Sequence, residues 1–157
     1  MSTKQANISK FLWLGYKCMA IEFKGLDNVL KAIDGVANIG VIESAMGTAC
    51  ALVERSAKQT APKDTGALRN SITSRVEKNS DNIKGIVFTP LEYAPYVEYG
   101  TGLFAEKGGR KTPWKYEDDK GNWHKTNGQR PQPFLRPALS QNRKKIIEII
   151  ERSVKNG

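Results

Sequence analysis

The sequence predicts one α+β domain, in which a long helix and a C-terminal helix pack on a small antiparallel β-sheet and an extended β-hairpin loop leaves the domain. Three patterns support this fold class: two apolar stripes with helical spacing, and two β-branched segments joined by a polar turn. The chain has 157 residues, of which 39% are hydrophobic and 26% are charged. This composition is too apolar for a disordered chain and too polar for a membrane protein, and the length suits one core.

The first 18 residues differ from the sequence that follows them. They are polar for ten residues and then carry a dense apolar run over 11–14, far shorter than the roughly 18 residues that cross a bilayer. From Met19 the chain reads as a conventional start, with a short alternating strand and then helical spacing over 26–33. We therefore expect residues 1–18 to be an extension outside the core and residues 19–157 to form the domain.

The first apolar stripe predicts a long amphipathic helix from about Val36 to Thr60. Pro62 ends it, because the residue before a proline avoids the α region. The stripe, with spacing i, i+3 and i+7, consists of Ile39, Ile42, Met46, Ala49, Val53 and Ala57. Small residues, which we expect to allow the close approach of another backbone, also occur in this helix: Gly40, Ala45, Gly47 and Ala51.

The remaining elements follow from local patterns. The β-branched segments 71–77 and 83–88 flank a polar turn, which predicts a β-hairpin. A second hairpin is expected over 114–123, with its turn at Lys120 and Gly121. The last helix accepts Pro137 in its first turn. Its apolar face consists of Leu139, Ile146, Ile150 and Val154.

The charge of the chain is concentrated in its C-terminal third. Lys and Arg number 25 against 16 Asp and Glu, a net charge of +9. Residues 101–157 contribute 13 basic and 6 acidic side chains, a net charge of +7. This positive balance disfavours an acidic protein that mimics a partner, and it disfavours a calcium buffer. It favours a chain that lies near polyanions or acidic neighbours. Cys18 and Cys50 cannot form a disulfide framework, and we interpret them as small apolar residues of a reducing compartment.

The candidate catalytic and metal-binding patterns are weak. Asp64, Thr65 and Gly66 form the tripeptide of aspartic proteases, but they follow the end of a helix rather than an apolar strand, so a capped turn is the better interpretation. The glycine-rich stretch 102–112 lacks the spacing of a phosphate-binding loop. His124 has no partner cluster, and the acidic triplet 117–119 suits a solvated turn better than a divalent ion. We therefore expect no catalytic, cofactor or metal site.

Three blocks in order resemble a known family. The block APKDTGALRNSI (61–72) is similar to the "APxDTGxLRxSI" motif of the gene-product-ten-like neck proteins of long-tailed phages, also described as head–tail connector or tail-completion proteins. The block YAPYVEYGT (93–101) resembles the "YAxYVExGT" motif of these proteins, and PQPFLRPA (131–138) resembles their "PxPFLRPA" motif. The likeness extends over roughly Ala20 to Val154.

The resemblance implies a structural virion protein of a phage or prophage, without catalysis or cofactor. Such proteins join the portal-bound head to the tail as a ring of about six subunits around the DNA channel. The implied partners are further copies of the chain, neighbouring neck and tail proteins and, non-specifically, DNA in the channel, with no membrane. The implied location is the virion neck, after assembly in the host cytoplasm. The family-motif positions are Pro62, Asp64, Thr65, Gly66, Leu68, Ser71, Tyr93, Tyr96, Glu98, Gly100, Thr101, Pro133, Phe134, Arg136 and Pro137.

Some of these positions carry individual expectations. We expect Leu68 and Ile72 to enter the core, and Phe134 and Leu135 to anchor the last helix. The tyrosines at 93, 96 and 99 suit a plug at the end of the sheet. A carboxylate among aromatic residues needs a partner, so Glu98 should cap backbone amides or pair with Arg69 or Arg136. Arg136 is also a candidate to face a neighbouring subunit.

The basic insertion 102–130 is long for a lone domain, and such loops are usually functional or disordered. In a ring it would reach a neighbour, a docking partner or DNA, and we expect it to order on assembly. Its aromatic residues fit either a stacking surface for single-stranded nucleic acid or a two-stranded arm with cross-strand packing. Candidate contacts to partners or DNA are Lys107, Arg110, Lys111, Trp114, Lys115, Lys125 and Arg130. The alternative function is a sequence-nonspecific DNA-binding protein.

Overall fold

The computed structural model describes residues 10–14, 18–23, 39–79, 82–106, 108–118 and 120–156. The elements of the body are β1 (Lys10–Leu14), β2 (Cys18–Phe23), α2 (Ile39–Thr60), α3 (Ala67–Ser71), β3 (Thr73–Asn79), β4 (Asn82–Thr89), α4 (Ala94–Tyr99) and α5 (Leu135–Asn156). Between α4 and α5 lie the 3₁₀ helix η1 (Gly102–Phe104) and the strands β5 (Trp114–Glu117) and β6 (Trp123–Thr126).

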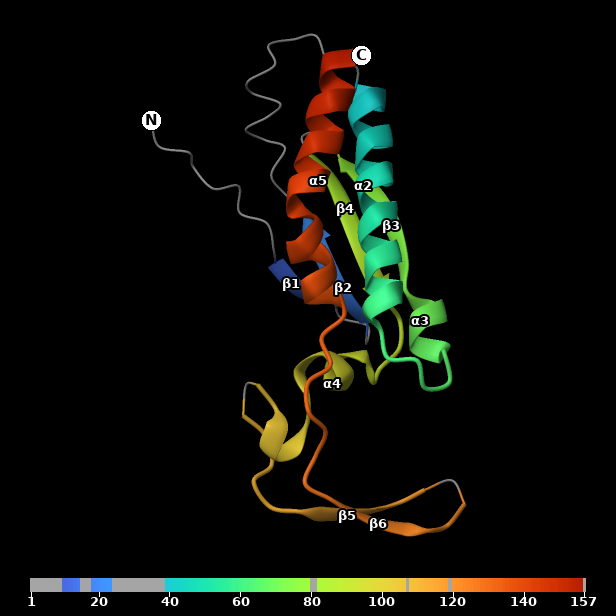
Figure 1. Ribbon diagram of the computed structural model, residues 1–157, viewed down its shortest axis with the longest axis vertical. Coiled ribbons are helices and arrows are strands. Elements are labelled where there is room, and N and C mark those ends of the chain that lie inside the picture. Colours follow the sequence, from blue (N-terminus) through green and yellow to red (C-terminus); the bar gives the residue numbers. More distant parts are fainter. Residues whose placement is uncertain are drawn as a thin grey trace.

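The body is a four-stranded antiparallel sheet with two long helices on one face. The strand order is β1-β2-β4-β3, and the register places Ile21 and Ser74 on either side of Val87. Figure 1 shows α2 and α5 side by side along the sheet, while the β5–β6 hairpin projects away from the end of the body where α3 and α4 lie. The predicted α+β class is confirmed.

The core forms where the predicted apolar stripes meet the sheet. The described stripe positions of α2 from Ile42 to Ala57 are at most 3% exposed, and Ile21 and Val87 are covered to the same degree. In α5, Leu139, Ile146 and Ile150 are buried and Val154 is partly buried. Helical spacing thus identified the core-facing positions correctly, because residues three or four apart share one face of a helix.

Both predicted hairpins are present with shifted bounds. The strand β3 begins at Thr73, because Ser71 ends α3, and β6 extends to Thr126, beyond the expected end at 123. The strand β1 is additional: residues 10–14 pair with β2 at the edge of the sheet, within the segment that we expected to be an extension. The division into residues 1–18 and 19–157 stays a prediction. The expected helical segment 26–33 lies outside the described residues.

The small residues of α2 do not all serve close packing. At Gly47 an added Cβ would meet no atom within 4 Å, so the expected approach of another backbone is wrong at this position. Ala51 is likewise exposed, whereas Ala45 is buried. Gly47 therefore lowers the stability of α2 without a packing gain that the structure shows.

We predict that Gly47→Ala raises the free energy of unfolding by about 1 kcal/mol, because alanine restricts the unfolded backbone and fits the open space beside the helix. Urea unfolding monitored by circular dichroism measures this change. The matched control is Gly66→Ala, where φ is +78° and an L side chain is strained. That substitution should lower stability, and equal effects of the two substitutions would contradict the prediction.

Candidate functional site

The three sequence blocks meet at the end of the body from which the hairpin projects. We call the segments 61–72, 93–101 and 131–138 together the motif junction. They lie up to 77 positions apart in the sequence, yet α3, α4 and the start of α5 gather in one region of Figure 1. The junction therefore depends on long-range contacts, which the following side chains supply.

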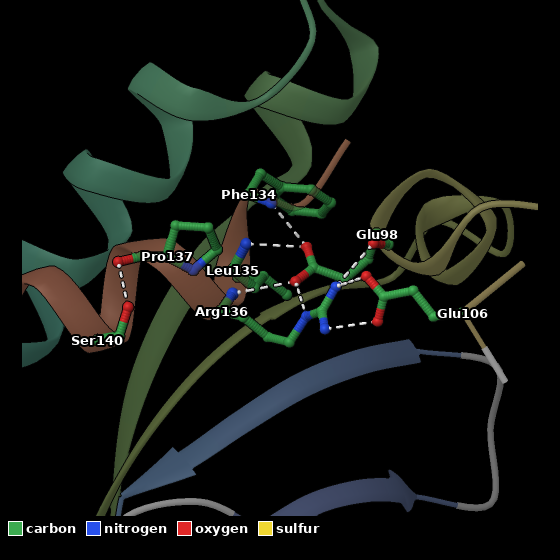
Figure 2. A network of polar contacts seen from close by, with 7 residues as sticks. All are labelled: Glu98, Glu106, Phe134, Leu135, Arg136, Pro137 and Ser140. Carbon is green, nitrogen blue, oxygen red and sulfur yellow. Dashed lines mark hydrogen bonds and ion pairs between the residues drawn. The ribbon is translucent and has the colours of Figure 1, made fainter. Parts of the chain in front are cut away.

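Glu98 is the centre of the junction. Its side chain is fully buried, and its Oε2 accepts hydrogen bonds from the backbone N–H groups of Phe134 (2.7 Å) and Leu135 (3.0 Å). Its Oε1 accepts from the backbone N–H of Arg136 (3.1 Å) and from Arg136 Nε (2.9 Å). Figure 2 shows this carboxylate facing the first turn of α5. The first N–H groups of a helix have no partner within the helix, and a carboxylate there also complements the helix dipole.

Glu98 thus caps a helix that begins 37 residues later. The prediction that it caps backbone amides and pairs with Arg136 is confirmed, whereas Arg69 is not its partner. Phe134 and Leu135 are fully buried beside it, as expected of the residues that anchor the last helix. Pro137 lies in the first turn of α5, where a proline ring is tolerated.

Arg136 links Glu98 to the base of the projecting segment. Its Nη1 and Nη2 donate to the two carboxylate oxygens of Glu106, each at 2.7 Å, and Nη2 also donates to the backbone carbonyl of Glu98 at 3.1 Å. The guanidinium lies 4.8 Å from the ring centroid of Tyr99. Hydrogen bonds to Glu106 and Glu98 raise the pKa of Arg136 above its ordinary value. A contact of Arg136 with a neighbour stays a prediction, and that neighbour would share a guanidinium already bound to two carboxylates.

The first block forms the turn between α2 and α3. Thr65 Oγ1 accepts a hydrogen bond from the backbone N–H of Ala67 at 3.3 Å, so the expected turn is present, whereas α3 itself begins after Gly66 without a side-chain cap. Leu68 and Ile72 are buried, as predicted, and Ser71 Oγ lies 2.7 Å from Thr89 Oγ1 at the end of β4. Pro62 follows the end of α2. Asp64 remains exposed on the surface.

The end of the second block holds the base of the hairpin. Gly100 has a φ of +74°, and an added Cβ would lie 2.8 Å from Gln129 O and from Pro131 Cδ. The backbone N–H of Thr101 donates to Gln129 O, and that of Gln129 donates to Thr101 Oγ1, both at 2.9 Å. Only glycine fits at position 100, because both the conformation and the space exclude a side chain.

The tyrosines of the second block do not plug the sheet. Tyr93 is 42% exposed and Tyr96 is 60% exposed, so this expectation is wrong. The segment is a short helix, and its inward face consists of Ala94 and Glu98, which are four residues apart. Tyr93 and Tyr96 consequently point away from the core, and only Tyr99 is half-buried.

A groove of about 370 Å³ runs between the first two blocks. Asp64 is the one carboxylate among its lining residues. The groove is lined by Pro62, Asp64, Thr65, Gly66, Leu68, Tyr93, Val97 and Gln129. The first and second blocks therefore share a surface, whereas the second and third blocks share the polar network of Glu98.

We call residues 102–130 the arm. Its hairpin pairs Trp114 with Thr126, Lys115 with Lys125, Tyr116 with His124 and Glu117 with Trp123. Paired residues share a face, so Trp114 and Tyr116 lie on one face and Trp123 lies on the other. The three aromatic side chains do not form one stacking surface. Instead Tyr116 stacks on His124 with ring centroids 5.3 Å apart, as in the two-stranded alternative.

The candidate contact residues are distributed along the arm. Arg110 lies 5.7 Å from the ring centroid of Trp114, and Arg130 lies 5.2 Å from that of Phe104. Lys111, Lys115 and Lys125 are exposed. Lys107 lies outside the described residues. The expectation that the arm orders on assembly stays a prediction.

Asp118 organises the turn of the hairpin. Its Oδ1 accepts from the backbone N–H groups of Lys120 (2.9 Å) and Asn122 (2.8 Å), and its Oδ2 lies 2.8 Å from His124 Nε2. Hydrogen bonds from His124 and from Asn122 lower the pKa of Asp118 to about 2. His124 therefore stabilises the turn through its contact with Asp118.

The described residues offer little for catalysis. No group of three His, Cys, Asp or Glu side chains gathers there as a metal site. Burial raises the pKa of the Cys50 thiol to about 12, so this thiol is not a nucleophile at neutral pH. No helix in the described ranges is long and apolar enough to cross a membrane.

Residues 27–100 match the family model described as "Bacteriophage HK97-gp10, putative tail-component". The family resemblance is confirmed. The matched segment contains the first block and all but Thr101 of the second, whereas the arm and the third block lie beyond it. No curated protein and no solved structure matches the chain at a significant level. The match supports a structural role as a phage tail component and a location in the virion.

Sequence reasoning missed two parts of the site. Glu106, the second carboxylate bound to Arg136, follows the family block and carries no local signal of its role. Gln129 lines the groove and holds Thr101 from the far end of the arm, and only the pairing of distant segments identifies it.

We predict that Glu98→Gln lowers the free energy of unfolding by about 3 kcal/mol, because an amide N–H₂ would face backbone donors in a buried site. Urea unfolding and the yield of soluble protein measure the effect. The matched control is Glu106→Gln, which removes the exposed carboxylate from the same arginine and should cost less than about 1 kcal/mol. Equal losses of unfolding free energy in the two variants would show that burial does not make Glu98 more important for stability than Glu106.

We predict that the turn of the arm loses order in acid. The lowered pKa means that the folded turn favours the ionised carboxylate of Asp118, so its contribution is complete above the ordinary pKa near 3.8 and disappears as the pH falls through about 2. Amide exchange of Lys120 and Asn122, followed by NMR, measures this change. Asp118→Asn should give fast exchange at neutral pH, and slow exchange in that variant would contradict the assignment.

Proposed function

We propose that this protein is a structural component of the neck of a phage or prophage virion. It joins the head and portal to the tail as a ring of about six subunits around the DNA channel. The match of residues 27–100 to a phage tail-component family carries the proposal. The neck position and the ring go beyond that match and follow from the likeness of all three blocks to neck proteins.

The geometry of the motif junction fits a structural role. The buried carboxylate of Glu98 is fully occupied by hydrogen bonds within the chain, and Arg136 holds two carboxylates at once. Such a network fixes the relative position of α4, α5 and the base of the arm. It leaves no polar group poised over a substrate, and it holds the arm at a defined place on the body.

The arm fits the same role, because it extends from the body and offers exposed side chains. Figure 1 shows the β5–β6 hairpin well separated from the sheet and the two long helices. In a ring, a segment of this kind reaches a neighbouring subunit or a docking partner. Its candidate contacts are the basic and aromatic residues named above, from Lys107 to Arg130.

The alternative is a sequence-nonspecific DNA-binding protein, which the basic C-terminal third favours. On α5 the exposed basic residues include Lys144, Lys145, Arg152 and Lys155. Affinity of a DNA binder falls with salt, with a log–log slope near −0.9 for each neutralised phosphate of duplex DNA. A steep slope with the isolated protein would favour this alternative, and weak binding with a shallow slope would favour the connector.

We predict that virions labelled at the C-terminus of this chain carry the label at the neck. The label is a tag on Gly157 decorated with gold, and negative-stain images of purified virions locate it. Untagged virions from the same strain serve as the control. Label along the tail tube or at the tail tip would contradict the neck, and unlabelled virions would contradict a virion component altogether.

A further inference from the structure

One face of the hairpin carries an exposed tryptophan and a lysine pair for which the rest of the described chain offers no ion-pair partner. The cross-strand register places Lys115, Glu117, Trp123 and Lys125 on this face, which we call the tryptophan face. Trp123 is 67% exposed. Lys115 and Lys125 lie directly opposite one another, and like charges in that position destabilise a strand pair. A partner that offers apolar surface and a carboxylate would relieve both features.

The described part of the chain does not supply that partner to its own arm. None of the described side chains forms an ion pair with Lys115 or Lys125. The hairpin also extends away from the body, as Figure 1 shows. A partner for the tryptophan face is therefore not found among the described residues of its own chain, which points to a second molecule.

The charge of the hairpin favours a protein over a nucleic acid. Residues 114–126 contain three lysines and three acidic residues, so the hairpin has no net charge. Affinity for nucleic acid comes mainly from the neutralisation of phosphates by an excess of basic residues. Glu117 also lies opposite Trp123 on the same face, where it would repel a phosphate.

The groove of the motif junction has the matching chemistry. Its walls include the apolar surfaces of Pro62, Leu68 and Val97 and the 42% exposed ring of Tyr93. Asp64 lies on its rim, is exposed, and forms no ion pair with a described residue. Trp123 lies opposite Glu117, and the Lys115–Lys125 pair lies at the neighbouring position of the same face. An aromatic side chain with a lysine pair to one side fits a groove with aromatic and apolar walls and one carboxylate.

We propose that the tryptophan face of one copy docks in the groove of a second copy. Trp123 packs against Tyr93 and the apolar walls, and the lysines at 115 and 125 face Asp64. Gln129 lies both in the groove and at the base of the arm, so the arm begins beside the groove of its own copy and leaves it. Every copy consequently presents one arm and one groove.

This contact joins two different surfaces, so it is heterologous. Repetition of a heterologous contact gives a closed ring or an open filament, and not an isolated symmetric dimer. The biological meaning of this contact rests on the proposed ring. The contact adds to that proposal the two surfaces that close the ring. It assigns Asp64 and Tyr93 to the contact, in addition to their place in the family blocks.

The test uses full-length chains with one surface altered at a time. The arm variant is Trp123→Ser and the groove variant is Asp64→Lys. Matched controls are Tyr116→Ser, an exposed aromatic residue on the other face of the hairpin, and Glu151→Lys, an exposed carboxylate on α5. Urea unfolding verifies that each variant is folded, and sedimentation velocity measures its size across a range of concentrations.

We expect the unaltered chain and both controls to form oligomers as the concentration rises. Each docking variant should need about tenfold more protein or more to associate, because a few central aromatic or charged residues carry most of the binding energy of a protein contact. An equimolar mixture of the two docking variants should form dimers and nothing larger. In that mixture the intact arm of the groove variant meets the intact groove of the arm variant, and neither complex can extend.

Three results would contradict the docking, and each has a different meaning. Oligomers of unchanged size and affinity in both docking variants would overturn the docking and leave a neck protein that assembles by other surfaces, which the label on virions tests separately. A monomer at every concentration of the unaltered chain would overturn it as well. Trp123→Ser that weakens binding to a fluorescent oligo-dT strand and leaves the oligomers unchanged would assign the tryptophan face to nucleic acid instead.

Discussion

The structure depends on one buried carboxylate. Glu98 lies out of contact with water, where an ionised group without donors would cost several kcal/mol. Three backbone N–H groups at the start of α5 and the guanidinium of Arg136 supply those donors. The need of the carboxylate for donors and the need of the helix for acceptors satisfy each other. The second and third blocks, which are distant in sequence, are therefore held together by a single requirement.

The network around Glu98 also fixes the position of the arm on the surface of the body. Arg136 extends it to Glu106, and Thr101 and Gln129 join the two ends of the arm, so the arm leaves the body from a fixed base. Beside that base the first two blocks leave a groove, because the helix of the second block turns its tyrosines outward. The chain thus combines a rigid centre with two exposed surfaces, which is the arrangement that a subunit of an assembly needs.

The elements of the body could be predicted because each buries one face with a simple period. The stripe from Ile42 to Ala57 and the β-branched strands are local patterns, and so is the proline that ends α2. A partner for Glu98 was also predictable, since a carboxylate among aromatic residues must be satisfied. Glu106, Gln129 and the groove were not, because they arise where distant segments meet. The tyrosines were misread because their spacing does not reveal which side of a short helix faces the core.

The cap on α5 also has a consequence for synthesis of the protein. A nascent chain that ends before Phe134 contains Glu98 but none of the backbone donors that satisfy it, and it lacks the helix that packs against α2. The body therefore cannot close until α5 has left the ribosome. Subunits become competent to associate only once this helix has packed.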